Sequence, residues 1–250
     1  MTHIENERLA YLDFLRGFAV LGLLLMNAPF MGLIEFGYVA HQPVVISDYV
    51  IAVANSLLLD GRFRSLFCLL FGIGIYLQYC SFARKGYAVN DTLLSRLNWL
   101  LVFGLIHCIF IWEGDILILY ALSGFFLIKR LHWSADKQLK TGLIFFAVGI
   151  VILFGEVALN VFFDEGVTRQ SKNFLQAYES LKGNYFESLF MSAAMAVLYI
   201  ITFPILSLFY LCGVMLIGIG LFRTGKLKNG FKPRELHVLL IVTALFSLAS

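Results

Sequence analysis

Charge is scarce in this chain. Only 14% of its 250 residues are Asp, Glu, Lys or Arg, whereas 60% are hydrophobic. A soluble domain carries about 25% charged residues, so this composition cannot cover a water-facing surface and excludes an ordinary soluble protein. The net charge of +3 is also too small to indicate a nucleic-acid partner.

The cysteines are not grouped as they would be in a metal site or a disulfide framework. The four cysteines lie singly in or beside apolar stretches, without a CxxC pair. Neither a disulfide framework nor a thiolate metal centre fits this spacing, and no metal site is predicted. We therefore expect the cysteines to be small buried apolar residues.

Long apolar runs dominate what is present. A membrane crossing needs roughly 20 mostly apolar residues. The runs predict crossings at 11–34, 65–82, 92–112, 115–133, 141–163 and 201–222, with a last apolar run at 236–250. The first run lacks a basic start and a cleavage site, so it is interpreted as a retained anchor. Residues 186–200 are interpreted as a packed approach helix before Pro204. Residues 47–60 are interpreted as an amphipathic helix that lies at the membrane interface or packs on the bundle. The predicted fold is all-α, a polytopic transmembrane helix bundle of six to seven crossings.

The basic residues predict the orientation of this bundle. Residues 31–61 and 113–128 contain no Lys or Arg, and most of the 19 basic residues lie at the other ends of the runs. Positive charge marks the cytoplasmic side, so the N-terminus is predicted to be cytoplasmic and 164–185 to be an extracytoplasmic loop. The predicted location is the cell (inner) membrane. Residues 1–222 form the expected bundle, and 223–250 a cytoplasmic loop with the start of a further helix in a chain expected to be truncated.

Three polar residues mark the first crossing. Asp13 and Arg16 are three residues apart and can pair on one helix face. Asn27 follows Arg16 by 11 residues, which returns it to nearly the same face about 16 Å further along the axis. Charged groups inside a crossing cost ~2.5–3.5 kcal/mol each. The stripe is therefore a candidate substrate-binding face, although a structural ion pair and a helix-contact amide would use the same residues.

The third crossing repeats this geometry with Arg96 and, 11 residues on, His107. An imidazole can donate or accept a proton near neutral pH, which suits general acid–base catalysis. The acidic turn with Glu113 and Asp115 follows at once, and a carboxylate beside a histidine can orient its tautomer. A satisfied interhelical histidine and a solvated hairpin are the structural alternatives. Asp48 and Arg62 complete the candidate substrate-binding residues, Arg62 through contact with an anionic substrate.

The second crossing contains a pair of small residues, Cys68 and Gly72, at four-residue spacing. Such small-xxx-small spacing favours close helix packing. We expect this pair to be structural.

Three segments together resemble the YeiB-like family of bacterial inner-membrane proteins. They are residues 12–17 with a D-x-x-R-G start, 69–72, and 104–121. In the last segment His107 is followed by a W-x-G-D-I-L-x-x-Y run from Trp112 to Tyr120. The resemblance covers nearly the whole chain. Members of that family usually continue into a C-terminal domain of unknown function, in agreement with the expected truncation.

In its first helices that family is similar to transmembrane acyltransferases such as heparan-α-glucosaminide N-acetyltransferase. The resemblance implies acyl transfer from cytoplasmic acyl-CoA, as co-substrate, to an extracytoplasmic acceptor. Arg16 and Arg96 would hold the phosphates, and His107 backed by Asp115 would be the catalytic base. The thioester oxyanion would be stabilised by Asn27, Trp112 or Tyr120. Heparan-type enzymes place a catalytic histidine in the loop after the first helix; His41 lies in that loop at a different spacing, so it is the second candidate.

Two other functions use the same residues. A multi-pass transporter or exporter would line its substrate path with the buried charges, and a non-catalytic accessory protein would use them to hold helices together. The sequence contains no inverted repeat, which disfavours the repeat-based transporters. The expected partners are the lipid bilayer, acyl-CoA and the acceptor, and association of identical copies stays open.

Overall fold

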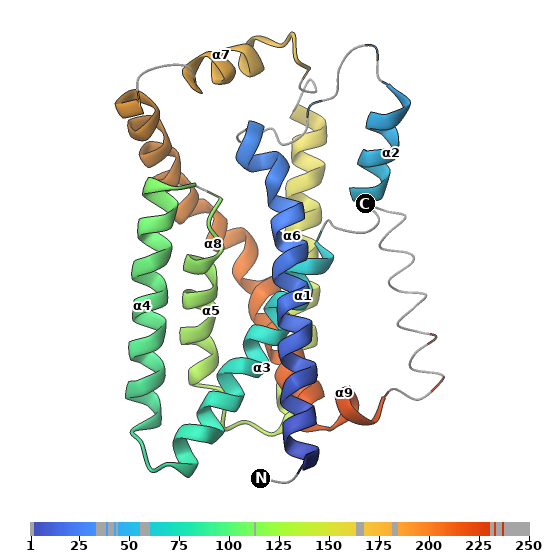
Figure 1. Cartoon of the computed structure of the whole chain (residues 1–250), viewed down its shortest axis with the longest axis vertical. Coiled ribbons are helices and arrows are strands. Elements are labelled where there is room, and N and C mark those ends of the chain that lie inside the picture. The colour runs from blue at the N-terminus through green and yellow to red at the C-terminus, as the bar shows by residue number, and fades with distance from the viewer. Residues whose placement is uncertain are drawn as a thin grey trace.

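The computed structural model describes residues 3–33, 39, 43, 45–55, 61–112, 114–163, 168–181, 185–230, 233 and 237. These residues form helices without any β-strand, as Figure 1 shows. The helices are α1 (His3–Leu33), α2 (Ile46–Ala54), α3 (Arg62–Arg84), α4 (Val89–Phe110), α5 (Leu117–Ile128), α6 (Ala135–Phe163), α7 (Lys172–Leu181), α8 (Tyr185–Arg223) and α9 (Lys226–Asn229). The predicted all-α bundle is confirmed.

Five of these helices are long and apolar enough to cross a membrane. The spans are Ala10–Ala28, Arg62–Arg84, Val89–Phe110, Ala135–Leu159 and Ala196–Arg223. The crossing predicted at 115–133 is shorter than expected, because α5 has only 12 residues. Twelve residues span about 18 Å, less than the ~30 Å hydrocarbon core. The bundle therefore has about six crossings, one of them short.

Two segments of the second half differ from the sequence interpretation. The approach helix and the crossing after Pro204 are one continuous helix of 39 residues, α8, with the proline inside it. The predicted loop at 164–185 contains the helix α7, which lies across one end of the bundle (Figure 1). The composition did not reveal α7, because this helix is short and amphipathic. It did not reveal the continuity of α8 either, because the chain is apolar on both sides of the proline.

The two predicted outer segments are only partly described. The interfacial helix expected at 47–60 is α2 at Ile46–Ala54, and 56–60 lie outside the described residues. On α2, Ile46 and Tyr49 are 83% and 68% exposed, and the position of this helix at the membrane interface stays a prediction. The apolar run at 236–250 lies outside the described residues except for position 237.

The basic segments gather at one end of the bundle. Figure 1 shows the N-terminus, the turn between α3 and α4, the turn between α5 and α6, and α9 at the same end, with α7 at the other. This is the separation that the distribution of Lys and Arg predicted. Which end faces the cytoplasm stays a prediction.

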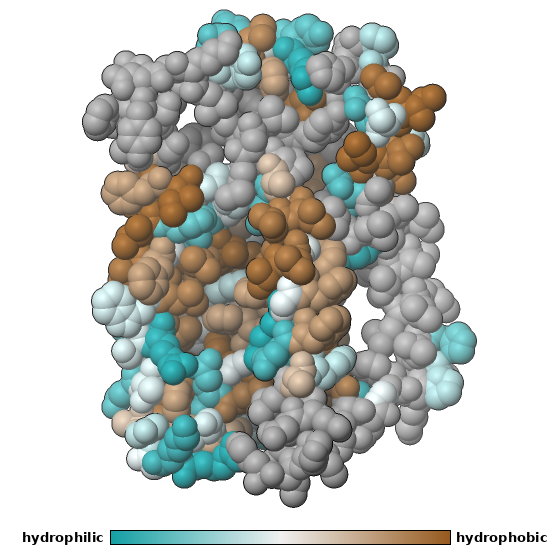
Figure 2. All heavy atoms as spheres, in the orientation of Figure 1, coloured by the Kyte–Doolittle hydropathy of each residue, from teal (hydrophilic) through white to brown (hydrophobic). Residues whose placement is uncertain are grey.

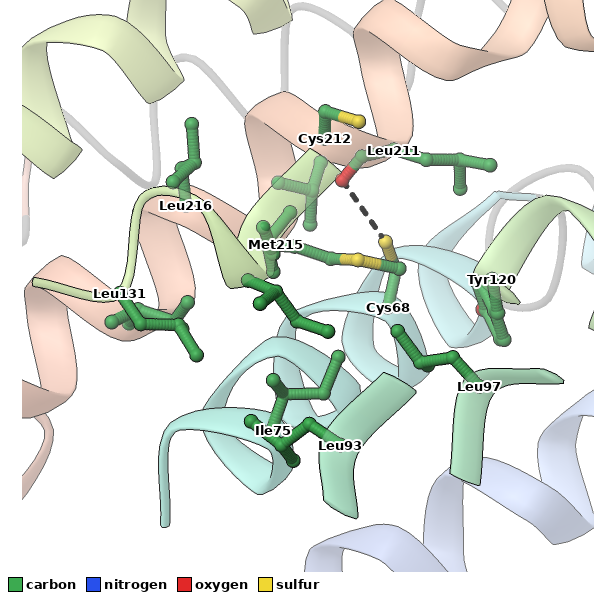
Figure 3. Packing of buried hydrophobic residues seen from close by; sticks show 14 of the residues in the cluster. Cys68, Ile75, Leu93, Leu97, Tyr120, Leu131, Leu211, Cys212, Met215 and Leu216 are labelled. Atoms are coloured by element: carbon green, nitrogen blue, oxygen red, sulfur yellow. Dashed lines mark hydrogen bonds between the residues drawn. The ribbon is translucent and has the colours of Figure 1, made fainter. Parts of the chain in front are cut away.

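The centre of the bundle is the contact between α3 and α8, shown in Figure 3. A Cβ at Gly72 would lie 2.6 Å from the carbonyl oxygen of Met215, so only glycine allows the two backbones to approach this closely. One turn earlier, the Cys68 thiol donates to the carbonyl of Leu211 at 3.4 Å. The predicted small-residue packing is confirmed, and it holds α3 as the platform on which the candidate site is built.

Candidate functional site

A groove of about 810 Å³ runs between α1 and α4. Its floor is α3, on which α1 and α4 both pack. Figure 2 looks onto this face, which is hollowed between α1 and α4, and hydrophilic residues gather around the lower part of the hollow. The groove therefore has a polar end and an apolar end.

Arginines from three helices line the polar end, namely Arg16 of α1, Arg84 of α3 and Arg96 of α4. On α1, Arg16 donates to Asp13 at 2.7 Å. A Cβ on Gly74 of α3 would lie 3.3 Å from Nη2 of Arg16, so the absence of a side chain there makes room for the guanidinium. On α4, Arg96 donates to the side-chain oxygen of Gln78 at 2.9 Å. The predicted pairing of Asp13 with Arg16 is present, and the structure adds that Arg16 and Arg96 line one groove.

Aromatic side chains line the apolar end. Phe67 and Phe71 of α3 face the groove together with Phe103 of α4. Both α3 rings stack on Tyr120 of α5, with ring centroids 5.5 Å and 5.0 Å apart. Tyr120 is only 1% exposed, so it lies behind these rings and does not line the groove. Its packing fixes the groove wall, and its role at an oxyanion stays a prediction.

A histidine–carboxylate pair lies one helical turn beyond Phe103. Nδ1 of His107 is 3.0 Å from Oδ1 of Asp115. The side chain of Asp115 is 2% exposed and that of His107 is 29% exposed, so the carboxylate is enclosed while the imidazole stays accessible. Nδ1 of His107 is buried and makes no hydrogen bond to any described residue, so the contact with Asp115 is a close approach without hydrogen-bond geometry.

Local structure explains why Asp115 reaches the histidine. Its second oxygen accepts a hydrogen bond from the backbone N–H of Ile118 at 3.0 Å, so the carboxylate caps the first turn of α5. The α5 start rests on Gly104, where a Cβ would lie 2.9 Å from the backbone nitrogen of Ile118 and 3.1 Å from Asp115. Glycine at 104 therefore allows the acidic turn to sit against α4, three residues before His107.

The groove and the histidine pair share one face of α4. Arg96, Leu100 and Phe103 line the groove, and His107 follows at the same three- to four-residue spacing, which keeps it on that face. Along the axis His107 lies about 16 Å from Arg96. The predicted site is thus divided into two parts along one helix, and the structure does not bring the arginines into contact with the histidine.

Four other candidates lie outside both parts. Asn27 is half-buried on α1, and Arg62 is half-buried at the start of α3. Asp48 lies in the first turn of α2, where its Oδ2 is buried without a hydrogen-bond partner among the described residues. The ring of Trp112 lies against Gly114 in the turn. None of the four lines the groove.

Two further candidates, Glu113 and His41, lie outside the described residues. Among the described residues no cluster of His, Cys, Asp or Glu could hold a metal ion.

Sequence reasoning missed Gln78, Arg84 and Gly104. Gln78 and Arg84 line the polar end of the groove, and Gly104 makes room for Asp115. The signal for Gln78 was present, since an amide inside an apolar run is a common helix contact. Gly104 had no such signal, because only the position of α5 shows what its missing side chain permits.

Comparisons with known proteins find two bacterial relatives over much of the chain. The chain is 30% identical over 239 residues to uncharacterized protein YeiB of Escherichia coli (strain K12), which is 92% of the chain and 59% of that protein. It is 32% identical over 197 residues to uncharacterized protein YxaH of Bacillus subtilis (strain 168), which is 71% of the chain and 46% of that protein. The chain thus spans about half the length of these relatives. The similarities are consistent with a YeiB-like family and show no acyltransferase relationship. No family model and no solved structure matches the chain.

Proposed function

We propose that this chain is part of a membrane-embedded acyltransferase that moves an acyl group from cytoplasmic acyl-CoA to an extracytoplasmic acceptor. The observation that supports it is the groove, whose arginine-lined end continues into an aromatic end on the helix face that leads to His107. An acyl-CoA has the same polarity along its length, with anionic phosphates at one end and an apolar acyl chain at the other.

The polar end suits the phosphates of coenzyme A. Arginine presents a planar fork of N–H donors that matches phosphate oxygens in pairs. The side chain of Arg16 is about one-third exposed and residue Arg96 is exposed, so both keep donors for a ligand. Asp13 and Gln78 hold the two side chains at the groove wall and reduce the freedom lost on binding.

The histidine pair suits proton removal from the acceptor. With Nδ1 facing Asp115, Nε2 of His107 is the nitrogen left to accept a proton. It would take the proton of an acceptor hydroxyl or amine as that atom attacks the thioester carbonyl carbon. The carbon–sulfur bond then breaks, coenzyme A leaves as the thiolate, and the imidazolium returns the proton to this thiolate. The buried carboxylate of Asp115 would stabilise the imidazolium.

Acyl-CoA binding and turnover, measured on the full chain in liposomes, test this proposal. General base catalysis contributes about 10²–10⁴-fold, so His107→Ala should lower turnover by that factor with acyl-CoA binding nearly unchanged. Arg96→Ala should weaken acyl-CoA binding more than the chemical step. The matched control is Lys85→Ala, which removes an exposed cation at the same end of the bundle but outside the groove lining, and should change neither.

Three results would contradict the proposal. Full activity in His107→Ala with loss of activity in His41→Ala would move the base to the first outer loop. Ion-dependent uptake of a solute by vesicles, without acyl-CoA turnover, would make the chain a transporter. If the chain neither binds acyl-CoA nor takes up a solute, the non-catalytic accessory role is the function that stays.

A further inference from the structure

The floor of the groove changes character along α3. Phe67 and Phe71 line its apolar end, whereas Gln78, Ser81 and Arg84 line its polar end. These three polar residues follow one another at three-residue spacing, at which side chains lie next to each other along a helix. Arg84 is exposed and is the last residue of α3. The floor therefore ends in a cation, at the end of the bundle where the basic segments gather (Figure 1).

The three arginines of the polar end lie at successive levels along this floor. The guanidinium of Arg16 lies beside Gly74, where an added Cβ would be 3.3 Å from its Nη2. Arg96 donates to Gln78, which is four residues or about 6 Å further along the helix axis. Arg84 follows Gln78 by six residues, which is about 9 Å further again. Arg84 is therefore the outermost of the three, on the side away from the aromatic rings.

Coenzyme A carries its phosphates at two levels along its length. A diphosphate joins the pantetheine arm to the ribose, and a separate phosphate is attached to the 3′ oxygen of that ribose. When the acyl group is directed toward His107, the diphosphate comes first and the 3′-phosphate lies further out. This order matches Arg16 and Arg96 at the inner levels and Arg84 at the outer level. Asp13 is the one carboxylate among the described lining residues, and it pairs with Arg16 at the inner level.

We propose that Arg84 recognises the 3′-phosphate of coenzyme A and so sets the preference of the groove for coenzyme A over its 3′-dephospho form. This inference rests on the proposed function, since it assigns the nucleotide end of the same ligand. A guanidinium donates two parallel N–H bonds to a phosphate, and Ser81 adds a neutral hydroxyl donor one turn before Arg84. A lipid headgroup with a single phosphate would occupy only one of the levels.

Binding of coenzyme A and of 3′-dephospho-coenzyme A to the full chain tests this assignment. The chain is held in nanodiscs of phosphatidylcholine, which adds no net lipid charge, and both Kd values are measured by calorimetry at one ionic strength. A charge-assisted hydrogen bond at an exposed site should make coenzyme A bind about 10-fold more tightly than the dephospho form. Arg84→Gln should abolish this ratio by weakening the binding of coenzyme A alone. Arg96→Gln should weaken the binding of both ligands and keep the ratio.

Lys85→Gln is the matched control. It removes an exposed cation from the neighbouring position, which does not line the groove, so this variant should keep the wild-type ratio. Arg84→Gln should bind the dephospho form as tightly as the wild type does. That result would show that the variant is folded and that its effect is confined to the 3′-phosphate.

Four results would overturn the assignment. Equal binding of the two ligands by the wild-type chain would refute the role of Arg84 and leave the proposed function in place. A ratio that persists in Arg84→Gln would place the 3′-phosphate elsewhere. Loss of the ratio in Lys85→Gln as well would assign the preference to the general positive charge of this end. If neither ligand binds the wild-type chain, the proposed function fails and this inference fails with it.

Discussion

Replacing Gly104 by alanine perturbs the contact that presents Asp115 to His107. The added Cβ would lie 2.9 Å from the backbone nitrogen of Ile118, whereas ordinary contacts lie at 3.4–4 Å. The start of α5 must therefore withdraw by at least about 0.5 Å. Because the obstructing atom belongs to the backbone, a side-chain rotation cannot relieve the clash.

The magnitude follows from two opposed effects. Overpacking a well-packed interior costs typically about 1–3 kcal/mol, and alanine stabilises a helix interior by roughly 0.5–1 kcal/mol relative to glycine. Gly155 on α6 has nothing within 4 Å of an added Cβ, so Gly155→Ala experiences only the second effect. The free energy of unfolding of Gly104→Ala should thus be lower than that of Gly155→Ala by about 1–3 kcal/mol.

The two variants are compared by heating detergent-solubilised protein and measuring the remaining monodisperse fraction by size-exclusion chromatography. We expect the Gly104→Ala midpoint to lie below the wild-type midpoint and the Gly155→Ala midpoint to lie at or above it. A midpoint of Gly104→Ala equal to that of Gly155→Ala would refute the close approach of α5 to α4, and with it the geometry of the histidine pair.

Two further predictions concern orientation and the first helix. The first uses single cysteines in a background without the native four. A cysteine at the exposed position of Leu175 should react with an impermeant thiol reagent in intact cells, whereas a cysteine at Ala88 should react only after the membrane is opened. The reverse labelling pattern would show that the predicted topology is inverted. Arg16→Ala should lower the yield of folded protein more than the Asp13→Ala, Arg16→Ala double change, because the single change leaves a carboxylate unpaired at membrane depth. Equal yields, measured by fluorescence-detected size exclusion, would show that the pair is not a structural unit.

The sequence predicted the parts of the site that follow from spacing along one helix. Asp13 and Arg16 are three residues apart, and the helix period alone brings their side chains together. His107 and Asp115 were paired from their closeness in sequence, and the contact is present. The structure adds that the crossing after them, α5, is short.

The relation between helices could not be predicted in the same way. Arg16 and Arg96 were expected to act together, but only the packing of α1 and α4 on α3 places them in one groove.

By itself the sequence determined that this chain is an all-α membrane bundle, because backbone groups in hydrocarbon must be satisfied within each segment and long apolar runs leave the helix as the solution. It also determined the separation of the basic segments, since charge is excluded from the apolar core. Tertiary structure decided which glycines let backbones touch and which rings form the groove wall. These depend on contacts between residues far apart in the chain, where the helix period carries no information and only packing selects one arrangement.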